Sequence, residues 1–408
     1  MTTWSRRWWL RSAFWIGAAV LAWRIVCLQL ASHFAGLATP AASASALDWY
    51  SGQPWALYQW ARRQLADHPE EGAEWLQRAA RANPSDGRVY ALLAAIRAAD
   101  GHWDSALELA DSADHLAPMR GEVQRELALL HARLGRVDSL LRHLMRAIDT
   151  SPDGRRDLFA QLLALLDDPG LRARTGSLIT PDKRWQPEFF AYAAEQARGV
   201  DVVEFLYRSG SSSIEMRRQI IARYQREQRW IDAYLAWIDG LSAQQVKALG
   251  NVYDGGFEQS VGDDEFGWHA AEVAGVKVQI EPRPDGAGRA LKLTFTGEIS
   301  PFRDVHQTLL LRPGRYQLRG EARTERLQAV RGIAWVLRCM TAANEVLGST
   351  EPLQGTSAWR EFTLTFIVPP LDCAAQDLRL ELTGRYAGEF QASGIAWFDN
   401  IRVLRSRV

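Results

Sequence analysis

Residues 85–118 read SDGRVYALLAAIRAADGHWDSALELADSADHLAP, and residues 119–152 read MRGEVQRELALLHARLGRVDSLLRHLMRAIDTSP. The two stretches share a closing proline, a central glycine and an aspartate three residues after the glycine, each offset by 34 residues. These residues are Pro118 and Pro152, Gly101 and Gly135, and Asp104 and Asp138, and Pro84 continues the series one period earlier. Registers that coincide in this way indicate an internal repeat.

This repeat resembles the tetratricopeptide family, in which each unit of about 34 residues is a pair of helices closed by a proline. Small residues such as Ala94 and Ala106 let the paired helices approach. The unit that ends at Pro84 matches less well, as is typical of a repeat that caps a stack. Beyond Pro152 the strict period fails, and we expect further helical hairpins with insertions. The resemblance implies an α-solenoid over residues 47–250 that binds protein partners on its concave face.

The N-terminal stretch has the composition of a membrane anchor. Three arginines lie within residues 1–11, residues 13–37 are mostly apolar, and no carboxylate occurs before Asp48. A helix over the apolar stretch would be about 37 Å long, enough to cross a hydrocarbon core of about 30 Å. Because basic residues mark the cytoplasmic side, residues 1–37 predict a single-pass anchor in a bacterial inner membrane. The N-terminus would be cytoplasmic and the bulk of the chain periplasmic.

Two features of this stretch leave alternatives open. Arg24 divides the apolar residues, and its guanidinium either reaches the outer headgroups or pairs with the helix of a partner. Ala44-Ser45-Ala46 has the small residues of a signal-peptide cleavage site, although it lies far beyond the apolar stretch. We favour an uncleaved anchor, followed by a short linker of alanine, serine and proline over residues 38–46.

From about Asn251 the helical periodicity gives way to an alternation of apolar and polar residues. Ile333, Trp335 and Leu337, for example, would share one face of a strand. About eight such strands, separated by turns rich in glycine, proline and aspartate, fit a jelly-roll β-sandwich over residues 251–408. We therefore expect a multidomain protein, α then β: a transmembrane helix, a tetratricopeptide-type α-solenoid and a β-sandwich.

Several motifs in the last region resemble carbohydrate-binding modules of the galactose-binding-like fold. They are Gly255-Gly256-Phe257-Glu258, Phe266-Gly267-Trp268, Leu311-Arg312-Pro313-Gly314-Arg315-Tyr316, Ser357-Ala358-Trp359-Arg360-Glu361-Phe362 and Trp397-Phe398-Asp399-Asn400-Ile401. In that family, the glutamate of the first motif and the aspartate of the last often help to hold a structural calcium ion. The matching residues here are Glu258 and Asp399. Carboxylate oxygens suit Ca²⁺, so the resemblance implies a calcium site at these two residues.

Sugar recognition needs a flat ring that stacks on a pyranose, flanked by groups that form hydrogen bonds. Four residues are available as candidates, although Trp335 alternates in phase with core positions. They are Trp268, Tyr316, Trp335 and Arg338. Trp359 and Trp397 match family positions that pack in the core, and we assign them there.

Two of the three cysteines, Cys339 and Cys373, lie in the β-region. This region is expected to be periplasmic, where disulfides form and persist. The pair therefore predicts a disulfide, and two separate buried thiols are the alternative.

The composition and the motifs exclude several functions. With 48 basic and 48 acidic side chains, the chain has no excess of positive charge for nucleic-acid binding. We find no phosphate-binding glycine loop, no nucleophile elbow and no zinc-protease motif. Acidic pairs such as Asp263-Asp264 fit a solvated turn better than the facing carboxylates of a glycosidase. We expect a protein without enzymatic activity.

Membrane-anchored architectures of this kind resemble accessory proteins of exopolysaccharide or lipopolysaccharide assembly. The resemblance implies a scaffold whose solenoid binds membrane-embedded or periplasmic polysaccharide-assembly proteins and whose β-domain contacts polysaccharide. The alternative is an envelope scaffold that binds only protein. Exposed rings on the β-domain would favour the first function, and a polar surface with those rings buried would favour the second.

Overall fold

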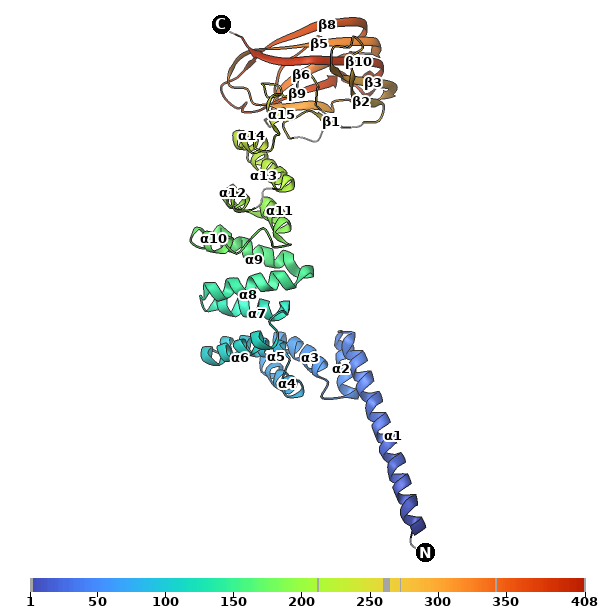
Figure 1. Ribbon diagram of the computed structural model, residues 1–408, viewed down its shortest axis with the longest axis vertical. Coiled ribbons are helices and arrows are strands. Elements are labelled where there is room, and N and C mark those ends of the chain that lie inside the picture. Colours follow the sequence, from blue (N-terminus) through green and yellow to red (C-terminus); the bar gives the residue numbers. More distant parts are fainter. Residues whose placement is uncertain (1–2, 211–212, 260–264, 272, 342, 407–408) are drawn as a thin grey trace. The chain divides into compact units, whose positions relative to one another are not determined.

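The computed structural model describes residues 3–210, 213–259, 265–271, 273–341 and 343–406. The chain divides into two compact units, Met1–Tyr192 and Ala193–Val408. Helices form the N-terminal part of the chain and strands form the C-terminal part (Figure 1). This order confirms the predicted fold class, a helical solenoid followed by a β-sandwich.

The first unit consists of helical hairpins preceded by one long helix. Its helices are α1 (Thr3–Gly36), α2 (Pro40–Trp49), α3 (Pro54–Asp67), α4 (Pro69–Ala82), α5 (Gly87–Ala99), α6 (Trp103–Leu116), α7 (Gly121–Arg133), α8 (Val137–Thr150), α9 (Arg155–Asp167) and α10 (Pro169–Gly176). The bounds of α5 and α6 recur in α7 and α8 after 34 residues. Gly101 and Gly135 turn the chain between paired helices at φ values of +80° and +66°, which glycine adopts without strain. The repeat read from the sequence is therefore a repeat of hairpins.

The segment between the anchor and the solenoid is a helix rather than a linker. In α2, the hydroxyl of Thr39 accepts a hydrogen bond from the backbone N–H of Ala42, and Pro40 occupies the first turn. Ala46 is fully buried and packs with Ala35 of α1. The prediction of a linker over residues 38–46 is therefore wrong. Alanine and serine suggested a flexible segment, but alanine is also the strongest helix former.

The second unit contains further helices and a sandwich of two antiparallel sheets (Figure 1). Its elements are α12 (Val200–Ser209), α13 (Ile214–Arg226), α14 (Trp230–Ile238), α15 (Ala243–Val246), β1 (His269–Ala270), β2 (Val276–Pro282), β3 (Arg289–Ile299), β4 (Val305–Leu309), β5 (Gly314–Ala329), β6 (Ile333–Cys339), β7 (Val346–Ser349), β8 (Gly355–Val368), β9 (Gln376–Leu382) and β10 (Gln391–Arg405), while α11 (Gln186–Gln196) contains the division between the units.

The two sheets have the orders β1-β4-β9-β6-β7, here sheet A, and β2-β3-β10-β5-β8, here sheet B. Alternate residues of their strands meet in one hydrophobic core, as Trp335 and Leu337 of β6 and Phe398 of β10 do. The intervening residues point away from the core, so each sheet has an outer face. Those two outer faces carry polar side chains, among them Arg338 on sheet A and Lys292 on sheet B.

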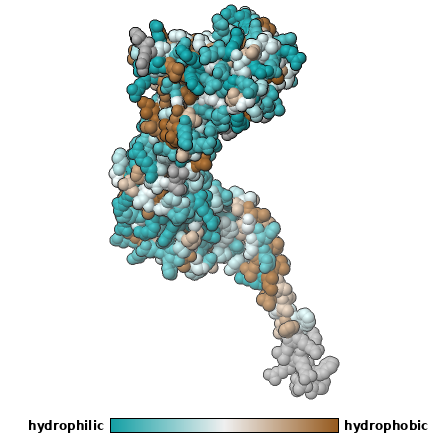
Figure 2. All heavy atoms as spheres, turned by 45° about the horizontal axis from the view of Figure 1, so that its top comes forward, coloured by the Kyte–Doolittle hydropathy of each residue, from teal (hydrophilic) through white to brown (hydrophobic). Residues whose placement is uncertain are grey.

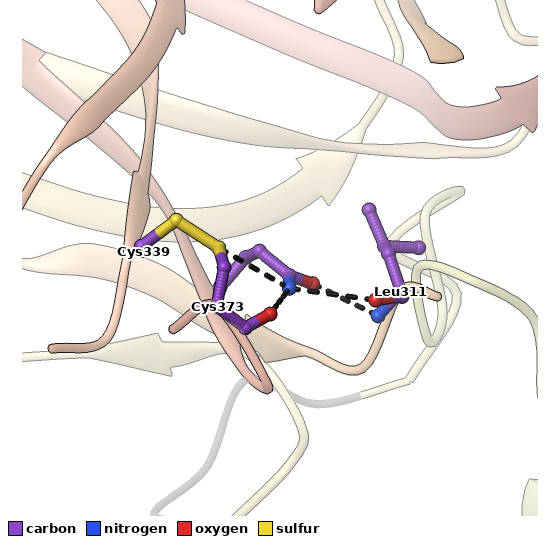
Figure 3. The surroundings of a disulfide bond; sticks show 4 residues. Leu311, Cys339 and Cys373 are labelled. Atoms are coloured by element: carbon purple, nitrogen blue, oxygen red, sulfur yellow. Dashed lines mark hydrogen bonds between the residues drawn. A yellow bond between two sulfur atoms is a disulfide. The ribbon is translucent and has the colours of Figure 1, made fainter. Parts of the chain in front are cut away.

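A disulfide between Cys339 and Cys373 closes one end of sheet A (Figure 3). It ties the end of β6 to the segment that precedes β9. The side-chain amide of Gln376 donates to the carbonyl oxygen of Cys373 at 2.7 Å, and its oxygen accepts from the backbone N–H of Leu311 at 2.8 Å. Of the two alternatives that the sequence left open, the structure contains the disulfide.

A buried polar network joins the second and third hairpins of the repeat. Gln124 of α7 donates to Asp114 of α6 at 2.8 Å, and its amide oxygen lies 2.7 Å from Nδ1 of His143 in α8. Because that oxygen accepts, the proton of the neutral His143 ring lies on Nδ1. The ring of His131 stacks on His143 with centroids 5.1 Å apart. Burial lowers the pKa of His143 to about 4 and also lowers the pKa of His131.

These two rings predict a dependence of stability on pH. Because folding depresses their pKa values, their contribution is complete above pH 6.5 and is lost as the pH falls from there toward 4. We expect the free energy of unfolding to decrease over this range, by up to about 3 kcal/mol from His143. His143→Gln should reduce the pH dependence of thermal unfolding, and the exposed His102→Gln serves as the control. An identical pH profile in wild type and His143→Gln would contradict this assignment.

Candidate functional site

The first helices of three successive hairpins share one polar groove. It has a cavity of about 50 Å³ and is lined by residues of α3, α5 and α7. The charged and aromatic members are Tyr58, Arg62, Arg88, Glu122, Arg125 and Glu126. We call this set the α3-α5-α7 groove.

Burial and ion pairing fix the chemistry of the groove. The guanidinium of Arg88 forms an ion pair with Asp86 at 2.6 Å and lies 4.9 Å from the ring centroid of Tyr58. Burial, with the nearby charge of Glu122, raises the pKa of Tyr58 to about 12, so its hydroxyl stays protonated. Burial also raises the pKa of Glu126. The groove thus combines a protonated hydroxyl with charges of both signs, which suits hydrogen bonding to an extended peptide.

Three of the four residues predicted to contact sugar lie in the core of the sandwich. Trp268 and Trp335 pack against each other with centroids 5.5 Å apart, and the indole N–H of Trp268 donates to the carbonyl oxygen of Asp254. Tyr316 stacks on Phe366, and all three predicted rings are at most 4% exposed. The prediction that Trp268, Tyr316 and Trp335 offer a stacking surface is therefore wrong, because their faces are covered by other core side chains.

Arg338, the fourth predicted residue, lies on the outer face of sheet A. Its neighbours along β6, Leu337 and Cys339, point into the core, so Arg338 points away from it. Its guanidinium donates to Glu381 of β9 at 2.7 Å. On the same outer face, Arg379 of β9 donates to Asp377 of the same strand at 2.7 Å. These residues, with Arg303, Asn344 and Thr383, line a cavity of about 480 Å³, here called the sheet A cleft.

Two histidines extend this polar face to the edge of sheet A. His269 of β1 is paired with His306 of β4, and their rings stack with centroids 4.9 Å apart. Burial and the charge of Arg379 lower the pKa of His306 to about 4, so this ring is neutral at pH 7. The outer face of sheet A therefore offers ion pairs and the neutral imidazole of His306 rather than the stacking rings that sugar recognition was expected to use.

Trp397 and Trp359 lie on the outer face of sheet B rather than in the core between the two sheets, although Trp397 is buried there and only 5% exposed. Phe398 belongs to the core, so its neighbour Trp397 points outward, where the ammonium of Lys292 covers its ring at 5.0 Å. Trp359 is half-buried beneath the guanidinium of Arg283, which lies 4.1 Å from the ring centroid. The assignment of both tryptophans to the core is corrected by this one-residue alternation.

Glu258 and Asp399, the residues expected to hold calcium, are each occupied by N–H donors. Asp399 is buried and accepts hydrogen bonds from the guanidinium of Arg283 and from the backbone N–H of Asn400. Glu258 accepts from the backbone N–H of Arg289 at 3.2 Å. Within the described ranges, no group of three or more His, Cys, Asp or Glu side chains is arranged to hold a metal ion. These residues do not fit a calcium ion, because a guanidinium already neutralises Asp399.

Arg283 instead organises this end of sheet B. Besides Asp399, it forms ion pairs at 2.8 Å with Asp285 and with Glu321. The hydrogen bond from Arg283 lowers the pKa of Asp285 to about 2. The guanidinium, 7% exposed, thus joins the loop after β2 to β5 and β10 through Glu321 and Asp399, and it stacks on Trp359 of β8.

Comparison with known proteins gives two kinds of structural neighbour, carbohydrate-binding modules and TPR proteins. No family model matches the chain, and no curated protein sequence matches it. A CBM22 xylan-binding domain from Paenibacillus barcinonensis is 11% identical with a TM-score of 0.26, covering 38% of this chain and 92% of its own. YrrB, a TPR protein with a peptide-binding site, is 14% identical with a TM-score of 0.29, covering 48% and 98%. PilF of Pseudomonas aeruginosa is 12% identical with a TM-score of 0.31, covering 53% and 90%.

The ion pairs of Arg283 with Asp285, Glu321 and Asp399 are expected to stabilise the β-sandwich without a bound metal ion. Arg283→Met would leave the buried Asp399 without a counter-charge, and we expect a loss of about 3 kcal/mol in the free energy of unfolding. The exposed Arg402→Met is the matched control and should have little effect. Urea unfolding of the full chain measures both variants. A lower melting temperature of the wild type in the presence of a calcium chelator would contradict this interpretation.

Proposed function

We propose that this protein is a membrane-anchored periplasmic scaffold that takes part in the assembly or export of a cell-surface polysaccharide, without enzymatic activity of its own. Its α1 would be the anchor in a bacterial inner membrane, with the arginines that precede the apolar span Ser12–Gly36 on the cytoplasmic side. The Cys339–Cys373 disulfide supports this location, because disulfides persist in oxidising compartments such as the periplasm.

The observation that carries the proposal is the α3-α5-α7 groove. Three repeats contribute to one surface, so an extended segment of a partner can be held by several hairpins at once. The groove is polar, with both signs of charge, and the anchor would concentrate it near partners embedded in the same membrane. Membrane-embedded or periplasmic polysaccharide-assembly proteins are therefore the partners we propose.

The sheet A cleft supports a contact between the β-domain and glycan through charge rather than through ring stacking. Arg338 and Arg379 face the cleft together with amide and hydroxyl groups. Arginine recognises carboxylate and phosphate groups by paired hydrogen bonds, so an acidic polysaccharide is the glycan that this surface fits best. Burial of the three predicted rings leaves this charged cleft as the surface through which glycan would bind. If no charged polymer binds it, the alternative function is favoured, an envelope scaffold that binds protein alone.

A charge exchange in the groove tests the scaffold function. Both Arg62 and Glu122 are exposed, and Arg62→Glu combined with Glu122→Arg keeps the net charge and the fold. We expect this double variant to reduce surface polysaccharide at least about tenfold in a deletion strain, since each like-charge contact with the partner costs of the order of 1 kcal/mol or more. The control is the exposed pair Arg97→Glu with Glu108→Arg outside the groove. Wild-type polysaccharide from the groove variant, at equal protein abundance, would refute the proposal.

Binding to polysaccharides decides between the two scaffold functions. The full chain in lipid nanodiscs would be titrated with acidic and neutral bacterial polysaccharides. We expect saturable binding of acidic polymers that Arg338→Ala with Arg379→Ala weakens about tenfold or more. Arg319→Ala, an exposed change on sheet B, is the control. If no polymer binds, the function without sugar contact is correct.

A further inference from the structure

The apolar part of α1 is longer than a membrane requires. Among the described residues, α1 is the helix long and apolar enough to cross a membrane, over Ser12–Gly36. Its 25 residues extend for about 37 Å, whereas a hydrocarbon core is about 30 Å thick. Some of these residues must therefore lie outside the hydrocarbon unless the helix is strongly tilted.

The surroundings of α1 change in the middle of this stretch. Between Ala13 and Ala22 its side chains are exposed almost without exception, and Figure 2 shows hydrophobic surface where α1 extends from the solenoid. At Trp23 and Arg24 one face of the helix meets the end of α2 and the residue that follows it, while Ile25, Val26 and Leu28 stay exposed. Trp49 lies edge-on to Trp23 with centroids 6.3 Å apart, and the guanidinium of Arg24 lies 5.2 Å from the ring centroid of Tyr50.

The end of α2 and the turn after it, which contact α1 at Trp23 and Arg24, carry polar groups that a hydrocarbon core does not accommodate. Asp48, two residues before Tyr50, is an exposed carboxylate. In the turn that follows, the carbonyl oxygen of Ser51 accepts a hydrogen bond from Arg78 of α4. Burial of charges and of irregular backbone in lipid costs several kcal/mol per group. The end of α2 and the start of α3 must therefore lie outside the hydrocarbon, and so must the part of α1 that they touch.

The end of α1 is also bound to the solenoid by polar contacts. Gln59 of α3 donates to the carbonyl oxygen of Ala35, and Arg63 donates to that of Ala38 at 3.0 Å. Ser43 of α2 donates to Gln59 at 2.7 Å. The last turns of α1, in which Ala31 and Ala35 are buried, thus belong to the same packed structure as α2 and α3, which contains glutamine, serine and arginine side chains.

From these contacts we infer that the outer boundary of the membrane lies at Trp23 and Arg24, and that the remainder of α1 is an extramembrane part of the solenoid. Trp23, Trp49 and Tyr50 form the ring belt found at such a boundary, and Arg24 lies among them at headgroup level. The inference rests on the proposed anchor and specifies how deeply it is inserted. The surface it assigns to lipid is α1 from Ser12 to Trp23.

The remaining length is sufficient for a short crossing. Arg11 precedes Arg24 by thirteen residues, so the helix between them rises by about 20 Å. A span shorter than the average hydrocarbon thickness is accommodated by local thinning of the bilayer and by flanking residues that reach toward the headgroups. Ile25, Val26 and Leu28, which are partly exposed, then lie within about 6 Å of the boundary, in the headgroup layer.

Cysteine accessibility tests this boundary. The full chain with Cys27→Ser, in vesicles of phosphatidylethanolamine and phosphatidylglycerol, would receive single cysteines at Ala19, Gln29 or His33, all exposed in the structure. A membrane-impermeant maleimide is expected to label Gln29→Cys and His33→Cys at least about tenfold faster than Ala19→Cys. Ser85→Cys in the solenoid gives the fraction of molecules facing outward, and labelling in detergent shows that every site can react.

The outcomes separate this inference from the proposed function. Protection of Gln29→Cys equal to that of Ala19→Cys would overturn the inference and leave the anchor intact. Labelling of all three sites, together with failure of the protein to float with the vesicles, would overturn the anchor itself. In a second comparison, Arg24→Leu should reduce the labelling of Gln29→Cys about fivefold or more, because the helix can then sink, whereas Arg24→Lys should not. Equal labelling in these two variants would contradict the role given to Arg24.

Discussion

Close contact between paired helices, made possible by side chains of minimal size, is the constraint on which the helical part of this protein depends. Ala94, Ala106 and Ala113 are fully buried where α5 and α6 approach each other. Gly87, the first residue of α5, has no room for a side chain, since a Cβ there would lie 2.7 Å from Cβ of Ala117. Gly121 meets Ser151 in the same way one repeat later. Compact hairpins of this kind present their first helices to one groove, which residues of α3, α5 and α7 line together.

Periodicity made the architecture predictable, and its failures have physical causes. A 34-residue period and a two-residue alternation report packing against neighbours, so hairpins and strands could be read from the sequence. The helix α2 was missed because its small residues carry no amphipathic pattern, although their propensity is high. Trp397 was misplaced because a shift of one residue exchanges the two faces of a strand, and Phe398 supplies the core instead.

The binding surfaces were less predictable because they depend on residues far apart in the sequence. Arg338 was identified, but its partner Glu381 lies 43 residues away, and Arg283 is 116 residues from Asp399. Contacts between residues so far apart in the sequence do not affect the local periodicity. The resemblance to carbohydrate-binding modules identified the positions Glu258 and Asp399 but not their surroundings. It could not reveal that the guanidinium of Arg283 pairs with Asp399. The groove would have required knowing which face of each first helix remains open.

Both candidate surfaces consist of charges that are already paired, and this determines how they can bind. In the groove Arg88 is held by Asp86, and in the sheet A cleft Arg338 is held by Glu381 at 2.7 Å. A ligand that takes one member of such a pair must supply the charge that it displaces, otherwise a half-buried ion is left without a partner. A simple polyanion has no donor for the freed carboxylate, whereas an acidic polysaccharide can offer its hydroxyl groups to it. Surfaces of this type therefore favour a partner that supplies both charge and hydrogen-bond donors over one with a high charge alone.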